Sequence, residues 1–201
     1  MIISEHAQGT PEWLAERAGI PTSSSFDMIV TSQGKPSKQR EKYLYTLAAE
    51  RITGVKAEHH QSQAMLNGIE REAEAREYYE FITGYEVEQV GACFPDARKR
   101  WASSPDGLVG EPGLLEIKCP LAHTHIGYLL DKKLPTAYSV QIQGQLLVTG
   151  RLWVDFLSYY PGLPHFLIRV EKDKFLQERL NVELESFVTE LDEITEKLRG
   201  Q

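Results

Sequence analysis

Two short segments constrain this chain most: Ser-Pro-Asp-Gly-Leu at residues 104–108 and Leu-Leu-Glu-Ile-Lys-Cys-Pro at residues 114–120. The proline and glycine around Asp106 indicate a turn, so this aspartate is expected to project beside the end of a strand. The apolar run that follows has the length of a buried strand, and Pro120 prevents its easy continuation. The sequence therefore predicts a carboxylate placed by a turn next to a buried strand.

The predicted strand carries charge on one side only. Side chains alternate along a strand, so Glu116 and Lys118 share one face while Leu115 and Ile117 point to the other. Burying a carboxylate and an ammonium needs compensation, which a divalent cation held by Asp106 and Glu116 would supply. A partly exposed Glu–Lys pair on an edge strand is the alternative, and the spacing alone leaves both interpretations open.

Length and composition indicate an ordinary globular protein. The 201 residues, 41% hydrophobic and 25% charged, suit a single domain over residues 1–201 with a substantial core. The sequence contains no run of about 18 apolar residues, so no membrane span is expected. The N-terminus lacks the pattern of a secretory signal, and Cys93 and Cys119 have no metal-site spacing, so reduced thiols and a cytoplasmic location are expected.

The net charge of −7 argues against a protein that coats nucleic acid by bulk electrostatics. It leaves room for a nuclease, because acidic residues around a metal site can dominate the total while a groove stays positive. Three basic clusters could contact DNA or simply be solvated surface. They are Lys35, Lys38, Arg40 and Lys42, then Arg98, Lys99 and Arg100, then Lys132 and Lys133.

Periodicity and turn residues outline the remaining elements. Thr10 is expected to cap a first helix with Pro11 at its first position, and a second helix is expected to begin in the serine run at 23–25. Further helices are predicted at 40–52, 62–83, 136–149 and 172–199, and strands at 86–90, 92–94, 101–103, 108–109, 114–119, 152–160 and 165–170. This order indicates one α+β or α/β domain.

Several polar residues have two interpretations from the local pattern. The serines at 23–25 offer hydroxyls and free amides at a helix start, which suits a phosphate cradle or an ordinary cap. Tyr138, Gln141 and Gln145 lie on one face of their predicted helix. That face is either a polar network or a partly exposed surface. Glu70 is the acidic residue of its helix expected to look inward, and the histidines at 123 and 125 are expected in a polar loop.

Six motifs in order along the chain together resemble the phage lambda exonuclease, or YqaJ-type viral recombinase, family of PD-(D/E)xK nucleases. A lone Asp…Glu-x-Lys is a weak signal, but six elements in register over about residues 8 to 149 are specific. The C-terminal third carries no such motif. The six are Gln8-Gly9-Thr10-x-x-Trp13, Arg17-x-Gly19-x-x-Thr22-x-Ser24, Gly68-x-Glu70, Ser104-Pro105-Asp106-Gly107-Leu108, Leu115-Glu116-Ile117-Lys118-Cys119-Pro120 and Tyr138-x-x-Gln141-x-Gln143.

The resemblance implies both a fold and an activity. The fold is a restriction-endonuclease-like core with a central mixed sheet flanked by helices. The activity is a Mg²⁺-dependent exonuclease, with Mn²⁺ as a substitute, that digests double-stranded DNA from 5′-phosphorylated ends and leaves 3′ single-stranded tails. The resemblance also implies a ring-shaped homotrimer, a partner single-strand annealing protein in recombination, and a phage or prophage protein in a bacterial host.

The matched motifs also imply roles for individual residues. Asp106 and Glu116 resemble the metal ligands, with the Ile117 backbone carbonyl as a third. Lys118 resembles the catalytic lysine, and Gln141 its partner on the following helix. An uncharged glutamine can hold a water or the lysine without adding another carboxylate.

Three further residues are placed by the same motifs. Glu70 corresponds to a glutamate of the long helix near the metal, and Arg17 and Ser24 to residues that bind the 5′ phosphate at the scissile end.

Two other classes of protein remain possible from the sequence: another PD-(D/E)xK endonuclease or repair nuclease, and a catalytically silent DNA-binding module on the same fold. Neither rival explains Arg17 and Ser24 as well.

Overall fold

A computed structural model describes residues 1–57 and 63–200, with the backbone alone for residues 63–67 and 69. Its centre is a five-stranded mixed sheet in the order β2-β4-β5-β6-β7. All neighbours are antiparallel except β5 and β6, which run parallel. The strands are β2 (Val87–Glu88), β4 (Gly107–Val109), β5 (Gly113–Lys118), β6 (Trp153–Ser158) and β7 (Phe166–Glu171).

The predicted strand after the Pro-Asp-Gly turn lies at the middle of this sheet. β5 pairs with β4 on one side, where Gly107 faces Leu115, and with β6 on the other, where Lys118 faces Ser158. A parallel pair needs a long crossover. Here the crossover contains α4 (Ala122–Asp131), the 3₁₀ turn η2 (Thr136–Tyr138) and α5 (Ser139–Thr149).

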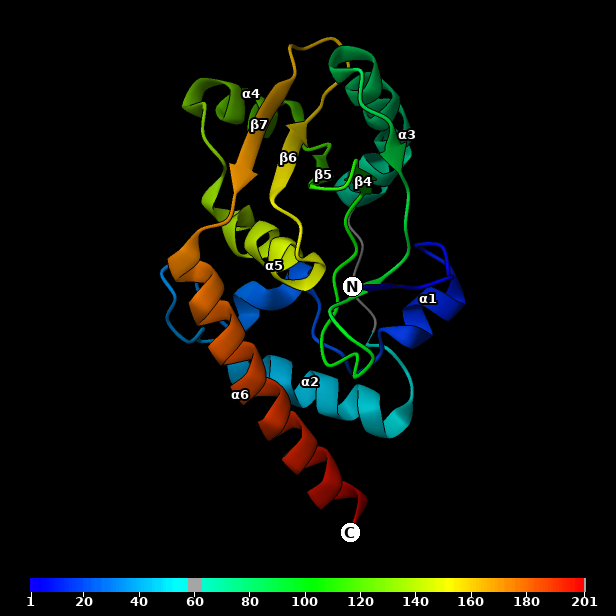
Figure 1. Ribbon diagram of the computed structural model, residues 1–201, viewed down its shortest axis with the longest axis vertical. Coiled ribbons are helices and arrows are strands. Elements are labelled where there is room, and N and C mark those ends of the chain that lie inside the picture. The colour runs from blue at the N-terminus through cyan, green and yellow to red at the C-terminus, as the bar shows by residue number, and fades with distance from the viewer. Residues whose placement is uncertain (58–62, 201) are drawn as a thin grey trace.

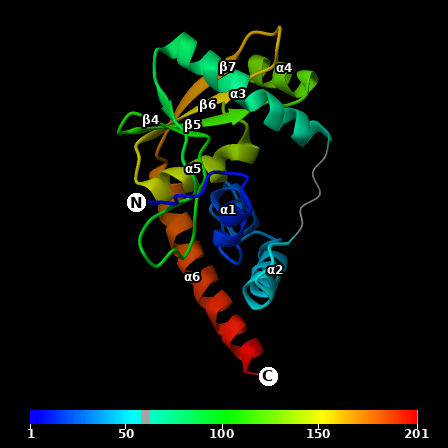
Figure 2. The ribbon, with the colours of Figure 1, turned by 90° about the vertical axis from the view of Figure 1, so that its right-hand side faces the viewer.

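Helices cover both faces of the sheet, which confirms the predicted fold class. Figure 2 shows the sheet between α3 (Gln63–Thr83) and α5. On the α3 face, Leu115 and Ile117 pack with Ala75 and Tyr79. On the α5 face lies the larger core, which includes Phe26, Leu114, Leu146, Phe156 and Leu184.

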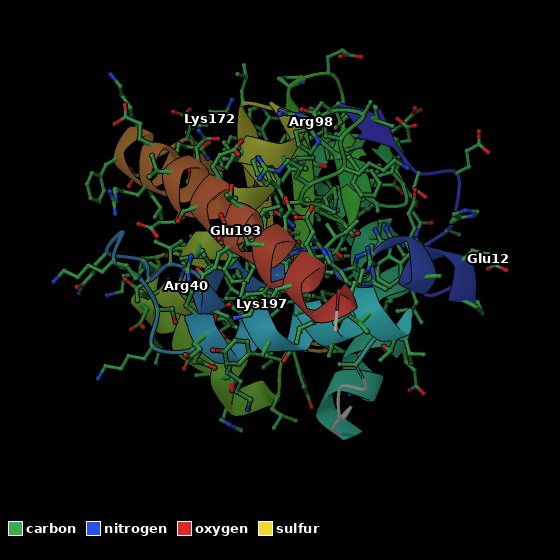
Figure 3. The ribbon with its side chains drawn as sticks, turned by 90° about the horizontal axis from the view of Figure 1, so that it is seen from below. Glu12, Arg40, Arg98, Lys172, Glu193 and Lys197 are labelled. Carbon is green, nitrogen blue, oxygen red and sulfur yellow. The ribbon has the colours of Figure 1, made fainter. Side chains whose placement is uncertain are left out.

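The longest helix, α6 (Lys174–Arg199), extends away from the sheet and packs on α2 (Arg40–Thr53), as Figures 1 and 3 show. Ion pairs fasten the two helices: Arg40 to Glu190 at 2.6 Å and Arg51 to Asp192 at 2.5 Å. Both helices lie close to the predicted bounds, because each has a long apolar stripe at helical spacing.

The N-terminal third departs more from prediction. Thr10 caps α1 (Pro11–Glu16) by accepting from the Trp13 amide, as expected. The serine run opens a 3₁₀ helix, η1 (Ser23–Met28), and β3 (Cys93–Phe94) pairs with β1 (Ile2–Ile3) outside the main sheet. Residues 101–103 form only isolated bridges, to Thr22 and Cys93.

The expectation of a polar loop around the histidines at 123 and 125 is wrong. Both lie in α4, and His125 is fully buried. Its Nδ1 lies 2.7 Å from Ser158 Oγ and its Nε2 lies 2.8 Å from the Pro164 carbonyl oxygen. Because both ring nitrogens have partners, a polar residue can occupy the inner side of this helix. Within the described ranges, none of the helices is sufficiently long and apolar to cross a membrane.

A buried charged cluster ties α3 to the sheet. Asp155 on β6 is almost fully buried, and its two oxygens accept from Arg169 Nε and Nη2, each at 2.8 Å. The Tyr79 hydroxyl donates to the same carboxylate at 2.8 Å. The Arg169 guanidinium lies 3.5 Å from the centre of the Trp153 ring, so part of its charge is covered by an aromatic face.

Replacing Asp155 with Ala is expected to lower the free energy of unfolding by about 1–3 kcal/mol, because the buried Tyr79 hydroxyl loses its acceptor. Arg169 is partly exposed and can be solvated, which limits the loss. Urea denaturation would measure the change. Asp96→Ala, which removes an exposed carboxylate paired with Arg98, is the control and should leave the midpoint unchanged.

Candidate active site

The β4–β5 turn fixes Asp106 against the central strand. The Asp106 amide donates to the Leu115 carbonyl at 3.1 Å, and the Ile117 amide donates to Asp106 Oδ2 at 2.6 Å. Gly107 is required beside it, because a Cβ there would lie 2.1 Å from Val87 Cγ1. The aspartate is therefore held next to Ile117, which lies between Glu116 and Lys118.

Glu116 is the buried centre of the site, with only 1% of its surface exposed. Lys118 Nζ lies 2.5 Å from Glu116 Oε1, and Gln141 Nε2 donates to the same oxygen at 2.6 Å. Gln145 Nε2 donates to the other oxygen, Oε2. Glu116 and Lys118 share one face of β5, as the alternation predicted, and that face meets α5.

The environment of the site shifts the pKa values of Asp106 and Lys118. Burial raises the pKa of Asp106 well above its usual range, and the nearby Glu116 raises it further, while Lys118 acts in the opposite direction. For Lys118, burial by itself lowers the pKa, but Glu116 and Asp106 outweigh burial and raise it above that of a free lysine. Lys118 is therefore protonated at neutral pH.

The residues fit a divalent cation. Two carboxylates face one ammonium, so the cluster carries excess negative charge in a buried place, and the raised pKa of Asp106 reflects this. Carboxylate and carbonyl oxygens from Asp106, Glu116 and Ile117 are the ligand types that Mg²⁺ and Mn²⁺ prefer. Among residues 1–57 and 63–200, no group of three or more His, Cys, Asp or Glu side chains is gathered closely enough to hold a metal. Backbone oxygen or water would therefore have to complete the coordination.

The long helix contributes a different glutamate from the expected one. Glu70, which was expected to look inward, is exposed. Glu72, two positions later, is the α3 carboxylate that raises the pKa of Asp106, and it pairs with Arg76 at 2.5 Å. A Cβ at Gly68 would make an ordinary contact with the Cys119 carbonyl oxygen, at 3.5 Å, so α3 passes close to the end of β5 at this position.

Arg17 is the centre of a second polar site. Only 7% of its surface is exposed, and its guanidinium lies 3.8 Å from the centre of the Trp13 ring. Burial lowers the pKa of Arg17 to about 10, so it remains a cation at neutral pH. Its Nε is buried and has no hydrogen-bond partner among the described residues. A buried, incompletely paired guanidinium suits an anion.

Hydrogen bonds join the serine run after Arg17 to the segment that precedes Asp106. The Ser23 amide donates to the Ala102 carbonyl at 2.9 Å, and the Ser23 hydroxyl donates to Ser103 at 2.9 Å. The following residue, Ser104, has a buried hydroxyl without a partner in the described part of the chain. Ser24 Oγ is exposed and lies 3.3 Å from Thr22 Oγ1. The serine run and the segment that leads into the Asp106 turn therefore lie side by side.

Comparison with known proteins places this arrangement in a family. The YqaJ-like viral recombinase domain matches residues 12–152. The chain belongs to this family. No curated protein matches it.

Solved structures agree with this assignment. An alkaline exonuclease, LHK-Exo from Laribacter hongkongensis, is 36% identical, with a TM-score of 0.86 and coverage of 94% of this chain and 96% of that one. LHK-Exo in complex with dAMP matches with a TM-score of 0.85 at the same identity and coverage. A phage related exonuclease from Haemophilus somnus 129PT, 13% identical over 89% of this chain and 96% of that one, shares the fold with a TM-score of 0.70. The family match and the likeness to LHK-Exo support a nuclease.

In this YqaJ-like chain, the basic cluster at residues 98–100 has partners within the protein. Arg98 pairs with Asp96, Lys99 with Glu16 and Arg100 with Glu185. Lys35, Lys38 and Lys42 are exposed. Lys99 and Arg100 therefore hold this loop to α1 and α6, whereas the earlier lysines are open to solvent.

Sequence reasoning missed three polar residues of the site. Gln145 was noted as part of a glutamine face, but only its contact with Glu116 across the crossover gives it a function. Glu70 and Glu72 are the same residue type on the same helix, and only the orientation of α3 about its axis decides which of them lies near Asp106. Ser104 lies in the quoted Ser-Pro-Asp-Gly-Leu motif, yet its orphan hydroxyl becomes visible only in the folded protein.

Replacing Asp106 with Asn is expected to stabilise the metal-free protein, increasingly so at higher pH. The raised pKa means that folding favours the neutral carboxyl, so this contribution to stability is lost as pH rises through the folded-state pKa. Asparagine keeps an acceptor for the Ile117 amide and carries no charge. Below the ordinary aspartate pKa of about 3.9 the advantage should vanish.

Thermal melts in EDTA at acidic and alkaline pH measure this effect. Asp96→Asn is the control, because Arg98 lowers the pKa of Asp96 and its loss should give no gain at high pH. Equal pH profiles for the wild type and Asp106→Asn would contradict the electrostatic interpretation of the site.

Proposed function

We propose that this protein is a Mg²⁺-dependent exonuclease that resects linear double-stranded DNA in the 5′-to-3′ direction from 5′-phosphorylated ends, leaving 3′ single-stranded tails. One observation carries the proposal. The structure contains a buried carboxylate–lysine cluster and a buried arginine that is incompletely paired among the described residues, and the serine run that follows this arginine is hydrogen-bonded to the segment that leads into Asp106. Such a pair combines a place for phosphodiester hydrolysis with a place for a terminal phosphate.

Hydrolysis needs an activated water, stabilisation of charge on the phosphoryl oxygens and assistance to the leaving 3′ oxygen. A divalent cation, when bound, supplies charge stabilisation and activation of the attacking water. Asp106, Glu116 and the Ile117 carbonyl would hold it. Mn²⁺ is expected to substitute for Mg²⁺, because both are octahedral ions that accept oxygen ligands.

Lys118 and Gln141 would act on the reacting groups. The raised pKa of Lys118 favours a protonated ammonium, which suits stabilising phosphoryl charge rather than accepting a proton. Gln141 is half-buried, and its side-chain amide, which donates to Glu116, can orient Lys118 or a water. For the α3 carboxylate near the cation, Glu72 is now the better candidate than Glu70.

End recognition would use Arg17, Ser24 and Ser104. Arginine offers a rigid fork of donors to phosphate, and the serine hydroxyls add further donors. The structure of LHK-Exo in complex with dAMP supports this part of the proposal, since dAMP is a nucleoside monophosphate. Binding of a terminal phosphate by these residues would explain a preference for phosphorylated ends.

The assembly and setting follow from the family resemblance. We propose a homotrimeric ring around DNA, a single-strand annealing protein as partner in recombination, and action in the cytoplasm of a bacterial host as a phage or prophage protein. Sedimentation of the purified protein would test the trimer.

Replacing Lys118 with Ala is expected to lower the rate of DNA digestion by about 10²–10³-fold, the cost of losing one preorganised charge-stabilising group. The assay uses linear duplex DNA with Mg²⁺ or EDTA, and closed circular plasmid beside it. Wild-type protein should degrade the 5′-phosphorylated strand only with Mg²⁺ and leave the circle intact. Cutting of the circle would indicate an endonuclease, and binding without digestion would indicate a silent module.

Replacing Arg17 with Ala is expected to reduce the preference for 5′-phosphate over 5′-hydroxyl ends by about 10- to 100-fold, the value of charged hydrogen bonds. Arg17→Lys keeps the charge but loses the fork, and should recover part of the preference. Both variants should digest 5′-hydroxyl DNA at the wild-type rate. An unchanged preference in Arg17→Ala would remove Arg17 from end recognition.

A further inference from the structure

Two buried glutamines of α5 differ sharply in how their polar atoms are satisfied. Gln143 is 4% exposed and Gln145 is fully buried. Gln143 Nε2 donates to the Glu171 carbonyl at 2.8 Å, while its Oε1 accepts from the Asp173 amide at 2.9 Å. Gln143 thus connects α5 to the segment that leads into α6, which is a structural role with both amide atoms used.

Gln145 has a different environment. Its Nε2 donates to Glu116 Oε2, and its Oε1 is buried without a partner among the described residues. A buried, unsatisfied carbonyl oxygen destabilises a fold, and an apolar side chain of similar volume would avoid that cost. The contact with Glu116 is therefore the feature that distinguishes glutamine from methionine at this position.

The contact is well placed to orient the carboxylate. Gln141 and Gln145 lie one helical turn apart and donate to opposite oxygens of Glu116. Two amide donors from one rigid helix fix the plane of the carboxylate, and with it the direction of its remaining lone pairs. Gln145 is wholly buried, so it reaches substrate only through Glu116.

We propose that Gln145 is a positioning residue that sets the orientation of Glu116 for cation binding. This inference rests on the proposed function, because it assumes that Glu116 holds a divalent cation. Residues that hydrogen-bond to metal ligands orient them, and their loss typically weakens metal affinity by about 10- to 100-fold.

The test uses the full-length chain with Gln145→Met, which conserves volume and removes the donor. The Mg²⁺ concentration for half-maximal digestion should rise by about tenfold or more, with the rate recovering at saturating Mg²⁺. Mn²⁺ binding measured by calorimetry without DNA should weaken by a similar factor. The melting temperature in EDTA should fall, because the buried Oε2 of Glu116 loses its donor, and removal of the unpaired Oε1 of Gln145 offsets only part of that cost.

Two further variants separate positioning from packing. Gln143→Met should lower the melting temperature and leave the Mg²⁺ midpoint at the wild-type value. Gln145→Glu keeps the size and polarity but turns the donor into an oxygen facing Glu116, so it should lose more Mn²⁺ affinity than Gln145→Met.

The outcomes distinguish this inference from the proposed function. A wild-type Mg²⁺ midpoint and Mn²⁺ affinity in Gln145→Met, with wild-type protein requiring Mg²⁺, would overturn the inference alone. An equal midpoint shift in Gln143→Met would also overturn it, since general loosening of α5 would then explain the effect. Digestion by wild-type protein in EDTA would overturn the metal requirement itself.

Discussion

The buried carboxylate of Glu116 is the interaction on which the site depends. A carboxylate with 1% exposure is tolerable only with charged or hydrogen-bonding partners. β5 supplies Lys118 from the same strand face, and α5 supplies two amides from across the crossover. The parallel pairing of β5 with β6 is what requires that crossover and so brings α5 to the charged face of the strand.

A second constraint comes from the chain that surrounds the Asp106 turn. Gln8 Nε2 donates to the Pro105 carbonyl at 2.8 Å, and the 21–24 segment is bonded to residues 102 and 103. The described part of the N-terminal third therefore contributes no strand to the main sheet but holds the segment around the Asp106 turn in place. Membership of the YqaJ-like viral recombinase family and likeness to alkaline exonucleases give this arrangement its chemical interpretation.

Much of the fold was accessible from sequence. The helices α2 and α6 and the β6–β7 hairpin follow from long apolar periodicities and strong turn residues. The strand expected at 101–103 is reduced to two isolated bridges, Ala102 with Thr22 and Ser103 with Cys93, because each pairing involves a single residue and does not extend into a ladder. The α4 helix was missed because the polar appearance of His125 hid a buried residue whose partners, Ser158 and Pro164, come from another part of the sequence.

The sequence by itself determined the Asp106, Glu116 and Lys118 grouping, because a Pro-Gly turn and strand alternation are local rules. It also determined, by ordered motifs, the family to which the chain belongs. Only the tertiary structure decided that Gln145 contacts Glu116, that Glu72 and not Glu70 influences Asp106, and that the Ser104 hydroxyl is buried without a partner among the described residues. These facts depend on the rotation of a helix or the approach of distant segments, which local spacing does not fix.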